Sequence, residues 1–466
     1  VFQETEYGGK ESVWAAFYCM LLVVWASLFL CHWKRLQATL QLQWEGAATS
    51  TEDAKRREFA EVERDRFRAK EHAAGFYEPV LDDYQFVELE RDAVPDGVPV
   101  PTAGKFPHYQ RTLYQGLSWT VLALCATVSV VAQLGLLLLR TRLQKEMEPS
   151  IAGGVVAAFL NAVLVEVLQA LFKPLVKMLV ALQNYRSKAA HEYHTAVQLF
   201  ALMFVNRFFS LFYLAMLKGV SDLRLFGPSN SRYYEVCTDR DGHPSDDCME
   251  ELFTQIVAML VFAFAVSHTA RLGSLFFTER RTRAQRQRRV DTEARMKPCH
   301  AVSTDFHELA MAFAMVTLFA GACPLAAGAA LVSNAVEGRS DAYKYLRATQ
   351  RPQTRAHADL GPWYAIFQFV CYMAILTNTV LMCYTSTALP DLVSMNVEAA
   401  NFDGHRFVML LVMEHVLLFG KILIDVLVPK MASGDVQEMA MQRKLIDLAD
   451  AHATKGTVRL GLNAAA

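Results

Sequence analysis

Charged residues are scarce in this chain and almost balanced in sign. They make up 20% of the 466 residues, with 46 basic against 47 acidic side chains. This near-neutral balance gives no support to nucleic-acid binding as a main role. Nine cysteines form no framework, because seven lie in or beside apolar or predicted cytosolic segments, which excludes a secreted disulfide scaffold. The sequence has no nucleotide-binding loop, nucleophile constellation or zinc-ligand spacing, so we expect no enzyme.

Long apolar blocks dominate what is present, with 53% hydrophobic residues and 29 Phe. Several blocks reach the roughly 18 to 25 residues that a helix needs to cross a bilayer, and the charges lie between them. The fold class we predict is therefore all-α, a polytopic helical membrane protein. The expected spans are 13–33, 113–139, 151–171, 196–217, 252–271, 309–322, 325–336, 367–384 and 407–428.

The sixth and seventh expected spans are individually short. Cys323-Pro324 separates them, and proline does not continue a helix cleanly, so the pattern predicts a tight hairpin. About 15 residues at roughly 1.5 Å rise each fall short of an apolar core of about 30 Å. We therefore expect both helices to extend past their apolar stretches.

The distribution of Lys and Arg predicts the orientation. Segment 271–297 carries a run of arginines and segment 344–355 is also basic, whereas segment 221–247 is acidic. The basic segments are expected in the cytosol and the acidic one outside or in a lumen; only Arg140, Arg142 and Lys145 disagree. The resulting organisation is an extracytosolic lead-in at 1–12, a transmembrane domain at 13–430 (cytosolic loops 34–112 and 272–304, extracytosolic loop 219–247) and a cytosolic tail at 431–466.

Cys237 and Cys248 lie in and directly after the acidic outer segment. They are a candidate disulfide in an oxidising compartment. Two free thiols are an equally acceptable interpretation of the sequence.

Four carboxylates flank the predicted hairpin. Asp305 and Glu308 are three residues apart before the sixth span, and Glu337 and Asp341 are four apart after the seventh, so each pair shares a helix face. The hairpin returns both pairs to the cytosolic level, where they would repel one another in a low-dielectric site. A hard divalent cation relieves this repulsion, and Ca²⁺ accepts about 6 to 8 oxygen ligands in flexible geometry. The pattern predicts a Ca²⁺ site.

Structural interpretations of these acids stay open. Asp305 is a suitable N-cap residue with Glu308 closing a capping box. Acids near a helix C-terminus oppose the macrodipole, although Arg339 and Lys344 are available as ion-pair partners for Glu337 and Asp341.

Polar residues also follow the third, fourth and fifth expected spans. Such stripes are typical of a hydrophilic groove or pore, and equally of hydrogen bonding between helices of a bundle. Glu166 and Arg207 are costly in a membrane and either mark the pathway or pair with each other. A lone His268 is more often a satisfied core residue. The candidate pathway residues are Asn161, Glu166, Gln169, Lys173, Asn206, Arg207, Ser210, Tyr213 and His268.

Seven segments of the chain are distinctive. They are FLCHWKRLQATLQLQW (29–44), NAVLVEVLQALFKPLVKMLVALQNYRS (161–187), FVNRFFSLFYLAMLKG (204–219), CMEELFTQ (248–255), DFHELAMAFAMVTLFAGACPLAAGAALVSNAVEGRSDAYKYL (305–346), GPWYAIFQ (361–368) and MEHVLLFGKILIDVLVP (413–429). In this order, from about residue 13 to residue 444, the chain resembles one known family, the anoctamins.

The resemblance implies a dimer of ten-helix subunits, of which this chain is similar to helices two to ten, without the cytosolic N-terminal domain and first helix. Anoctamins are Ca²⁺-activated phospholipid scramblases, chloride channels or both, with a membrane-exposed groove in each subunit. We therefore expect Ca²⁺ as cofactor, phospholipids and chloride or other small ions as partners, and a homodimer through the last span, with Glu414 and His415 at the interface. The expected location is the plasma membrane or endoplasmic reticulum.

The resemblance also assigns ligands. The Ca²⁺ ligands of the family match Asp305, Glu308, Glu337 and Asp341, with Asp305 at a position where many members have Glu. Two further ligand positions on the sixth family helix hold His268 and Leu272, which predicts weakened Ca²⁺ activation. An auxiliary family site is depleted as well, because Cys31 and Lys430 stand at acid positions while Asp425 remains.

The leading functional expectation is a phospholipid scramblase with accompanying ion conductance. The alternative is an anion-selective channel, which Lys173 and Arg207 favour and Glu166 opposes. A third alternative is a non-conducting tether or regulatory member, which the residues His268 and Leu272 motivate.

Overall fold

A computed structural model describes the helical parts of the chain and the short turns that join them. The described ranges are 13–43, 108–146, 150–185, 188–218, 237–238, 244–245, 248–284, 302–350, 360–385 and 402–429, with a few single positions besides.

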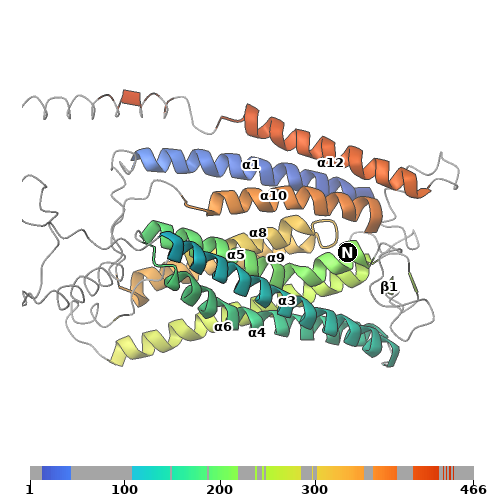
Figure 1. Cartoon of the computed structure of the whole chain (residues 1–466), viewed down its shortest axis with the longest axis horizontal. Coiled ribbons are helices and arrows are strands. Elements are labelled where there is room, and N and C mark those ends of the chain that lie inside the picture. The colour runs from blue at the N-terminus through green and yellow to red at the C-terminus, as the bar shows by residue number, and fades with distance from the viewer. Residues whose placement is uncertain are drawn as a thin grey trace, which may run out of the picture.

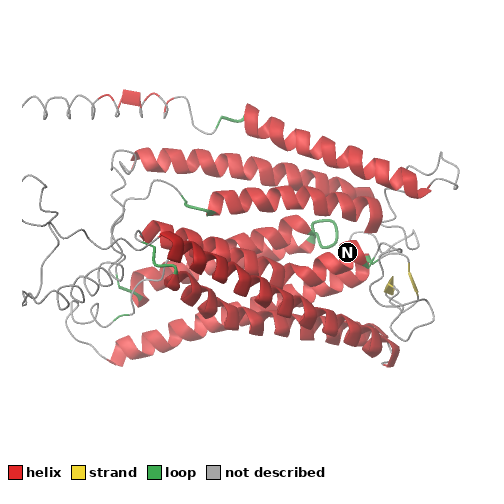
Figure 2. Ribbon diagram, in the orientation of Figure 1, coloured by secondary structure: helices red, strands yellow, loops and turns green. Residues whose placement is uncertain are grey.

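Within these ranges the chain forms nine α-helices and one two-stranded hairpin (Figure 2). The helices are α1 (Val13–Gln43), α3 (His108–Glu146), α4 (Ser150–Leu182), α5 (Lys188–Phe212), α6 (Met249–Ala284), α8 (Val302–Leu318), α9 (Leu325–Tyr343), α10 (Trp363–Val380) and α12 (Phe402–Leu427). Wider π-helical turns continue three of them: η2 (Tyr213–Leu217), η3 (Lys344–Ala348) and η4 (Leu381–Thr385). Strand β1 (Cys237–Thr238) pairs antiparallel with β2 (Pro244–Ser245).

Seven of the described helices are long and apolar enough to cross a membrane, namely α1, α3, α4, α5, α6, α10 and α12. The remaining two, α8 and α9, form the predicted hairpin, whose turn is closed by hydrogen bonds from the Cys323 N–H to the Phe319 carbonyl (3.2 Å) and from the Ala326 N–H to the Cys323 carbonyl (3.0 Å). Helix α8 begins before its apolar stretch and α9 continues beyond its own, as the length argument predicted. The all-α prediction is confirmed.

Several helices also run past the apolar blocks into the predicted cytosolic loops. Helix α1 continues to Gln43 and α6 to Ala284, so both extend into the segments 34–112 and 272–304, whose cytosolic location stays a prediction. The physical reason is that hydropathy marks where a helix leaves the apolar layer, whereas the backbone hydrogen bonds of a helix persist in water.

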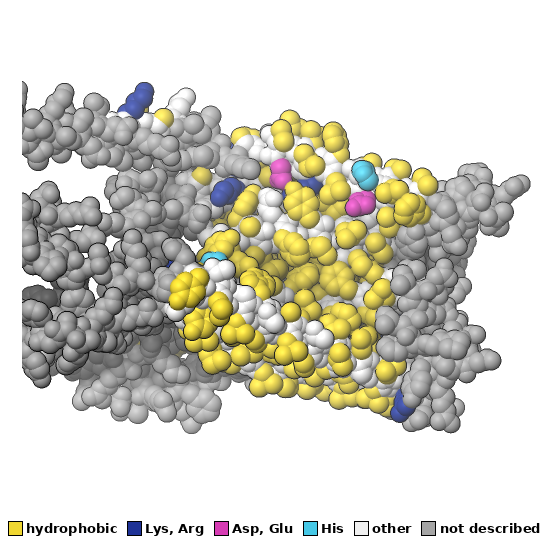
Figure 3. All heavy atoms as spheres, in the orientation of Figure 1, with side chains coloured by type: hydrophobic (Ala, Val, Ile, Leu, Met, Phe, Trp, Pro, Cys, Tyr) yellow, Lys and Arg dark blue, Asp and Glu magenta, His cyan; other side chains and the backbone are white. Residues whose placement is uncertain are grey.

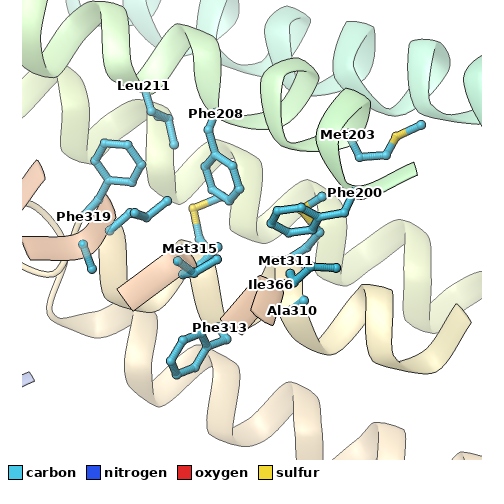
Figure 4. Packing of buried hydrophobic residues seen from close by; sticks show 14 of the residues in the cluster. Phe200, Met203, Phe208, Leu211, Ala310, Met311, Phe313, Met315, Phe319 and Ile366 are labelled. Atoms are coloured by element: carbon cyan, nitrogen blue, oxygen red, sulfur yellow. The ribbon is translucent and has the colours of Figure 1, made fainter. Parts of the chain in front are cut away.

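The helices form one elongated bundle (Figure 1). Helices α3, α4, α5 and α6 pack on one another, and α1, α10 and α12 form a second group. Helix α8 joins the groups by packing on both α5 and α10. The core at this junction is aromatic and Met-rich: Phe208 stacks on Phe319 with 6.3 Å between centroids, and Phe208 and Met315 point toward each other (Figure 4).

The surface of the described part is largely apolar (Figure 3). On α12, the side chains of Val412, Phe419 and Val426 are all more than half exposed. Soluble monomers rarely expose contiguous apolar patches of this kind. A membrane around the bundle accounts for it.

A disulfide lies at the end of the bundle where α6 begins. The structure joins Cys237 of β1 to Cys248, with 5.1 Å between their Cα atoms, a separation that suits a disulfide. The link ties the β1–β2 hairpin to the first turn of α6.

Candidate functional site

Hydrogen bonds between α3, α4 and α5 engage several of the predicted pathway residues. The fully buried Asn206 donates to the Val165 carbonyl (3.0 Å) and accepts from the Ser129 hydroxyl (2.7 Å). Asn161 donates to the Ser210 hydroxyl (3.0 Å). Interhelical hydrogen bonding, the alternative that the sequence left open, therefore describes Asn161, Asn206 and Ser210. Tyr213 is also buried, at the start of η2.

Sequence reasoning missed the α3 side of this network. Gln133 is fully buried, and its amide donates to the Asn206 carbonyl (2.9 Å) and to the Ser129 hydroxyl (3.0 Å). The available signal was Ser129 and Gln133, which are four residues apart in the second expected span, a spacing that places them on one helix face. The network fastens α3 to α5 at the level where Asn206 also reaches α4.

The charged pathway residues lie differently, because they are only partly buried. Arg207 of α5 forms an ion pair with Glu166 of α4, with side chains 16% and 19% exposed. Gln169 donates to the other oxygen of the same carboxylate (3.2 Å). Lys173 on α4 interacts electrostatically with Glu166 and with Glu308 of α8. Glu166, Arg207 and Lys173 are thus one charged group on α4 and α5, and its electrostatic interactions include Glu308 of α8.

Helices α4 and α6 pack along each other. Phe159 of α4 meets Phe262 of α6 edge to face, with 5.3 Å between ring centroids. We call this contact line the α4–α6 seam. The side chains of His268 and Leu272, farther along α6, lie outside the described residues.

At the predicted carboxylate site, one lysine lies between two of the four acids. Lys344 Nζ is 4.0 Å from Asp305 Oδ1 and 3.6 Å from Asp341 Oδ1. The hydroxyl of Tyr345 donates to Asp305 Oδ2. We call Asp305, Asp341 and Lys344 the inner cluster. Of the other two acids, Glu308 interacts with Lys173, and the Glu337 carbonyl accepts a hydrogen bond from Ser340.

A second ionic cluster lies where α6 begins. Glu251 accepts a hydrogen bond from Lys218 Nζ (2.6 Å) and lies 3.5 Å from Arg140 Nη2, and all three side chains are 3% exposed. We call these three residues the outer cluster. It explains why Arg140 departs from the Lys and Arg distribution, since its charge is buried against Glu251.

Comparison with known proteins gives the family. A family model described as "Anoctamin: Calcium-activated chloride channel" matches residues 9–443. The chain belongs to the anoctamin family. Among curated relatives it is 24% identical to anoctamin-1 of Homo sapiens (84% of this chain, 43% of the relative), 25% to anoctamin-4 of Bos taurus (81% and 40%) and 23% to anoctamin-7 of Rattus norvegicus (80% and 42%). The chain spans about two fifths of the length of these relatives.

As an anoctamin, the chain is a multi-pass integral membrane protein, and its family comprises Ca²⁺-activated chloride channels and scramblases. The inner cluster of this chain provides part of what a Ca²⁺ site requires. Asp305 and Asp341 supply hard carboxylate oxygens that already face one positive charge. Within the described ranges, however, no three His, Cys, Asp or Glu side chains converge. The four-acid Ca²⁺ site stays a prediction, two of whose members face a common point.

The auxiliary region of this anoctamin also holds a lysine. Lys421 is almost fully buried and donates to Asp425 Oδ2 (2.9 Å) on the same helix, α12. The thiol of Cys31 on α1 donates to the other oxygen of Asp425 (3.6 Å), and Lys421 Nζ lies 4.6 Å from the centroid of the Tyr372 ring. Lys430 lies outside the described residues.

Proposed function

We propose that this anoctamin moves phospholipids and small ions passively across a membrane, along a polar route beside the α4–α6 seam. The observation that carries the proposal is the partly exposed ion pair Glu166–Arg207, with Lys173 next to it, in the middle of two apolar helices. Charges at such a depth are costly and typically mark a transport path.

The charges suit a phospholipid headgroup. Arg207 and Lys173 can bind its phosphate, and Glu166 can bind a positively charged amine, while the acyl chains stay in the bilayer. For a lipid to enter, α4 and α6 have to separate and the Phe159–Phe262 contact has to break. The protein supplies a path and no energy, so opening is a population shift between a closed and an open seam.

We further propose that Ca²⁺ regulates this opening through Asp305, Glu308, Glu337 and Asp341. Bound there, the ion would supply positive charge that offsets the repulsion between the carboxylates. Glu308 links this site to the path, because it interacts with Lys173. A change in the charge around Glu308 therefore changes the electrostatic potential at Lys173, which itself interacts with Glu166 and Arg207.

The homodimer through α12 belongs to the same proposal. Glu414 is half-buried and His415 is exposed on this helix, whose other exposed side chains from residue 407 onward are apolar, such as Val412 and Val416. A second copy that covers this face would shield both polar side chains from lipid.

The packed seam itself favours a second candidate function. A groove closed by contact between α4 and α6 is what an anion-selective channel requires, because ions pass behind the seam and lipids do not. Lys173 and Arg207 would then attract the anion, against the opposing charge of Glu166.

Reconstitution of the purified protein in liposomes tests these functions. A fluorescent-lipid assay measures lipid movement, and a chloride-flux assay on the same vesicles measures ion movement. Movement of both supports the scramblase proposal. Chloride flux without lipid movement would replace it with the channel, and the absence of both would leave the non-conducting tether.

A further inference from the structure

We propose that Lys344 is a built-in counter-cation of Asp305 and Asp341, which a divalent cation has to displace in order to bind. The inference rests on the proposed Ca²⁺ regulation and deepens it. It states that the protein itself lowers its affinity for Ca²⁺ and, when the ion is absent, cancels one of the two negative charges of these acids.

The position of Lys344 follows from the end of α9. Lys344 is the C-cap residue of this helix, and its N–H bonds to the carbonyls of Asp341 and Ser340. Asp341 is three residues earlier, so the two side chains share a helix face. The chain then continues in the wider turn η3, which places Lys344 and Tyr345 opposite Asp305 on α8.

Both oxygens of Asp305 are engaged in this arrangement. Oδ1 faces the Lys344 ammonium, and Oδ2 accepts the Tyr345 hydroxyl. A cation ligated by Asp305 therefore competes with Lys344 and Tyr345 for these oxygens. Lys344 Nζ lies 5.3 Å from the centroid of the Tyr345 ring, so the two competing groups are themselves neighbours.

The charge count shows why the ammonium opposes a metal ion. Asp305 and Asp341 together carry about two negative charges, and Lys344 cancels one of them within 4.0 Å. A divalent cation that enters beside Lys344 meets half the attraction and an added repulsion. If Lys344 leaves first, the cation gains the full attraction, but the broken ion pairs oppose binding.

Exposure makes the exchange feasible. The Lys344, Asp305 and Asp341 side chains are 23%, 26% and 18% exposed. A partly exposed ammonium can move into water, whereas a fully buried one would leave an uncompensated charge behind. Lys344 is therefore able to release the acids without unfolding the hairpin.

The test is direct Ca²⁺ binding to the purified protein in detergent micelles, measured by isothermal titration calorimetry. Lys344→Met is expected to lower the dissociation constant on the order of tenfold. Tyr345→Phe should lower it about twofold to threefold, because it removes one hydrogen bond to Asp305. The matched control is Arg347→Met, which removes the same charge from an exposed residue of the same turn; its dissociation constant should stay within about twofold of the parent.

Equal or weaker binding by Lys344→Met overturns the inference. So does an equal gain in Arg347→Met, because the effect would then be a general loss of positive charge. Lys344→Gln is the second variant if Lys344→Met does not fold, as judged by its elution volume in size-exclusion chromatography. Adding Asp341→Asn to Lys344→Met should remove the gain in affinity.

These outcomes are separate from those of the transport proposal. Calorimetry contains no transport readout, so absent lipid or ion movement leaves the role of Lys344 standing. If no variant binds Ca²⁺, the role of Lys344 falls together with the proposed regulation, whereas lipid movement in liposomes still tests the pathway.

Discussion

The outer and inner clusters are built from the same groups in opposite proportions. In the outer cluster one carboxylate, Glu251, lies between two cations, and every side chain is 3% exposed. In the inner cluster one cation, Lys344, lies between two carboxylates that are 18% and 26% exposed. Burial decides what each can do. The outer charges have no water to replace a lost partner, so the cluster is a fixed joint between α3, η2 and α6, while the inner cluster can exchange its cation.

The largest effect is expected from Glu251→Gln. This variant leaves Arg140 and Lys218 without their carboxylate in a buried site, which costs about 3–5 kcal/mol of unfolding free energy. Thermal denaturation in detergent measures the loss. The matched control is Glu250→Gln, which neutralises the exposed acid next to it. Equal melting temperatures for the two variants would show that the outer cluster is not a structural joint.

Neutralising two of the four predicted Ca²⁺ ligands, one of them in the inner cluster, should affect Ca²⁺ binding strongly and stability little. Glu337→Gln combined with Asp341→Asn is expected to weaken Ca²⁺ binding at least about tenfold. It should change the unfolding free energy by only about 1 kcal/mol or less, because Asp341 and its partner Lys344 are partly exposed. Calorimetry and thermal denaturation of the same samples check both values. Unchanged Ca²⁺ binding would remove the four-acid assignment.

The ion pair Glu166–Arg207 is more exposed than the outer cluster and less exposed than most of the inner cluster. Glu166→Gln combined with Arg207→Gln removes both charges and leaves neither unpaired, so lipid and chloride movement should slow about tenfold while the melting temperature stays close to that of the parent. Lys177→Gln, on the exposed surface of α4, is the control. Transport at the parental rate in the double variant would place the path elsewhere.

The smallest effect is expected at Tyr185, in the turn after α4. This residue lies at the predicted cytosolic end, like the inner cluster, but it is buried. Its hydroxyl accepts from Gln115 (2.8 Å) and donates to Gln183 (2.7 Å), so Tyr185→Phe should cost about 1 kcal/mol.

Tyr185 also adds a pH dependence. Burial raises the pKa of its hydroxyl, against the opposing effects of Gln115 and Arg111. The neutral form is therefore favoured in the folded protein, and its contribution is complete below the unfolded pKa of about 10 and is lost as the pH rises through and above that value. Melting curves between pH 8 and pH 11 should show a smaller decline for Tyr185→Phe than for the parent. An equal decline in the variant and the parent would exclude Tyr185 as a source of the pH dependence.

Much of the fold was predictable because it depends on local properties. An apolar block of sufficient length indicates a membrane helix wherever its neighbours lie, and Pro324 with two short blocks indicated the hairpin of α8 and α9. The sequence also offered an ion pair between Glu166 and Arg207 as one alternative, and the structure pairs them across two helices. The role of Asn161, Asn206 and Ser210 was not predictable, because an amide or hydroxyl in a membrane span suits a pore and a helix interface equally.

The sequence by itself therefore determined that this chain is a helical membrane protein of the anoctamin family with acids at the base of a short hairpin. Only the tertiary structure decided which partner each charge has. Lys344 meets Asp305 across the hairpin, and Glu251 meets Arg140 from another helix. The physical reason is that hydropathy and helix periodicity act over neighbouring residues, whereas the partner of a buried charge depends on how separate helices pack.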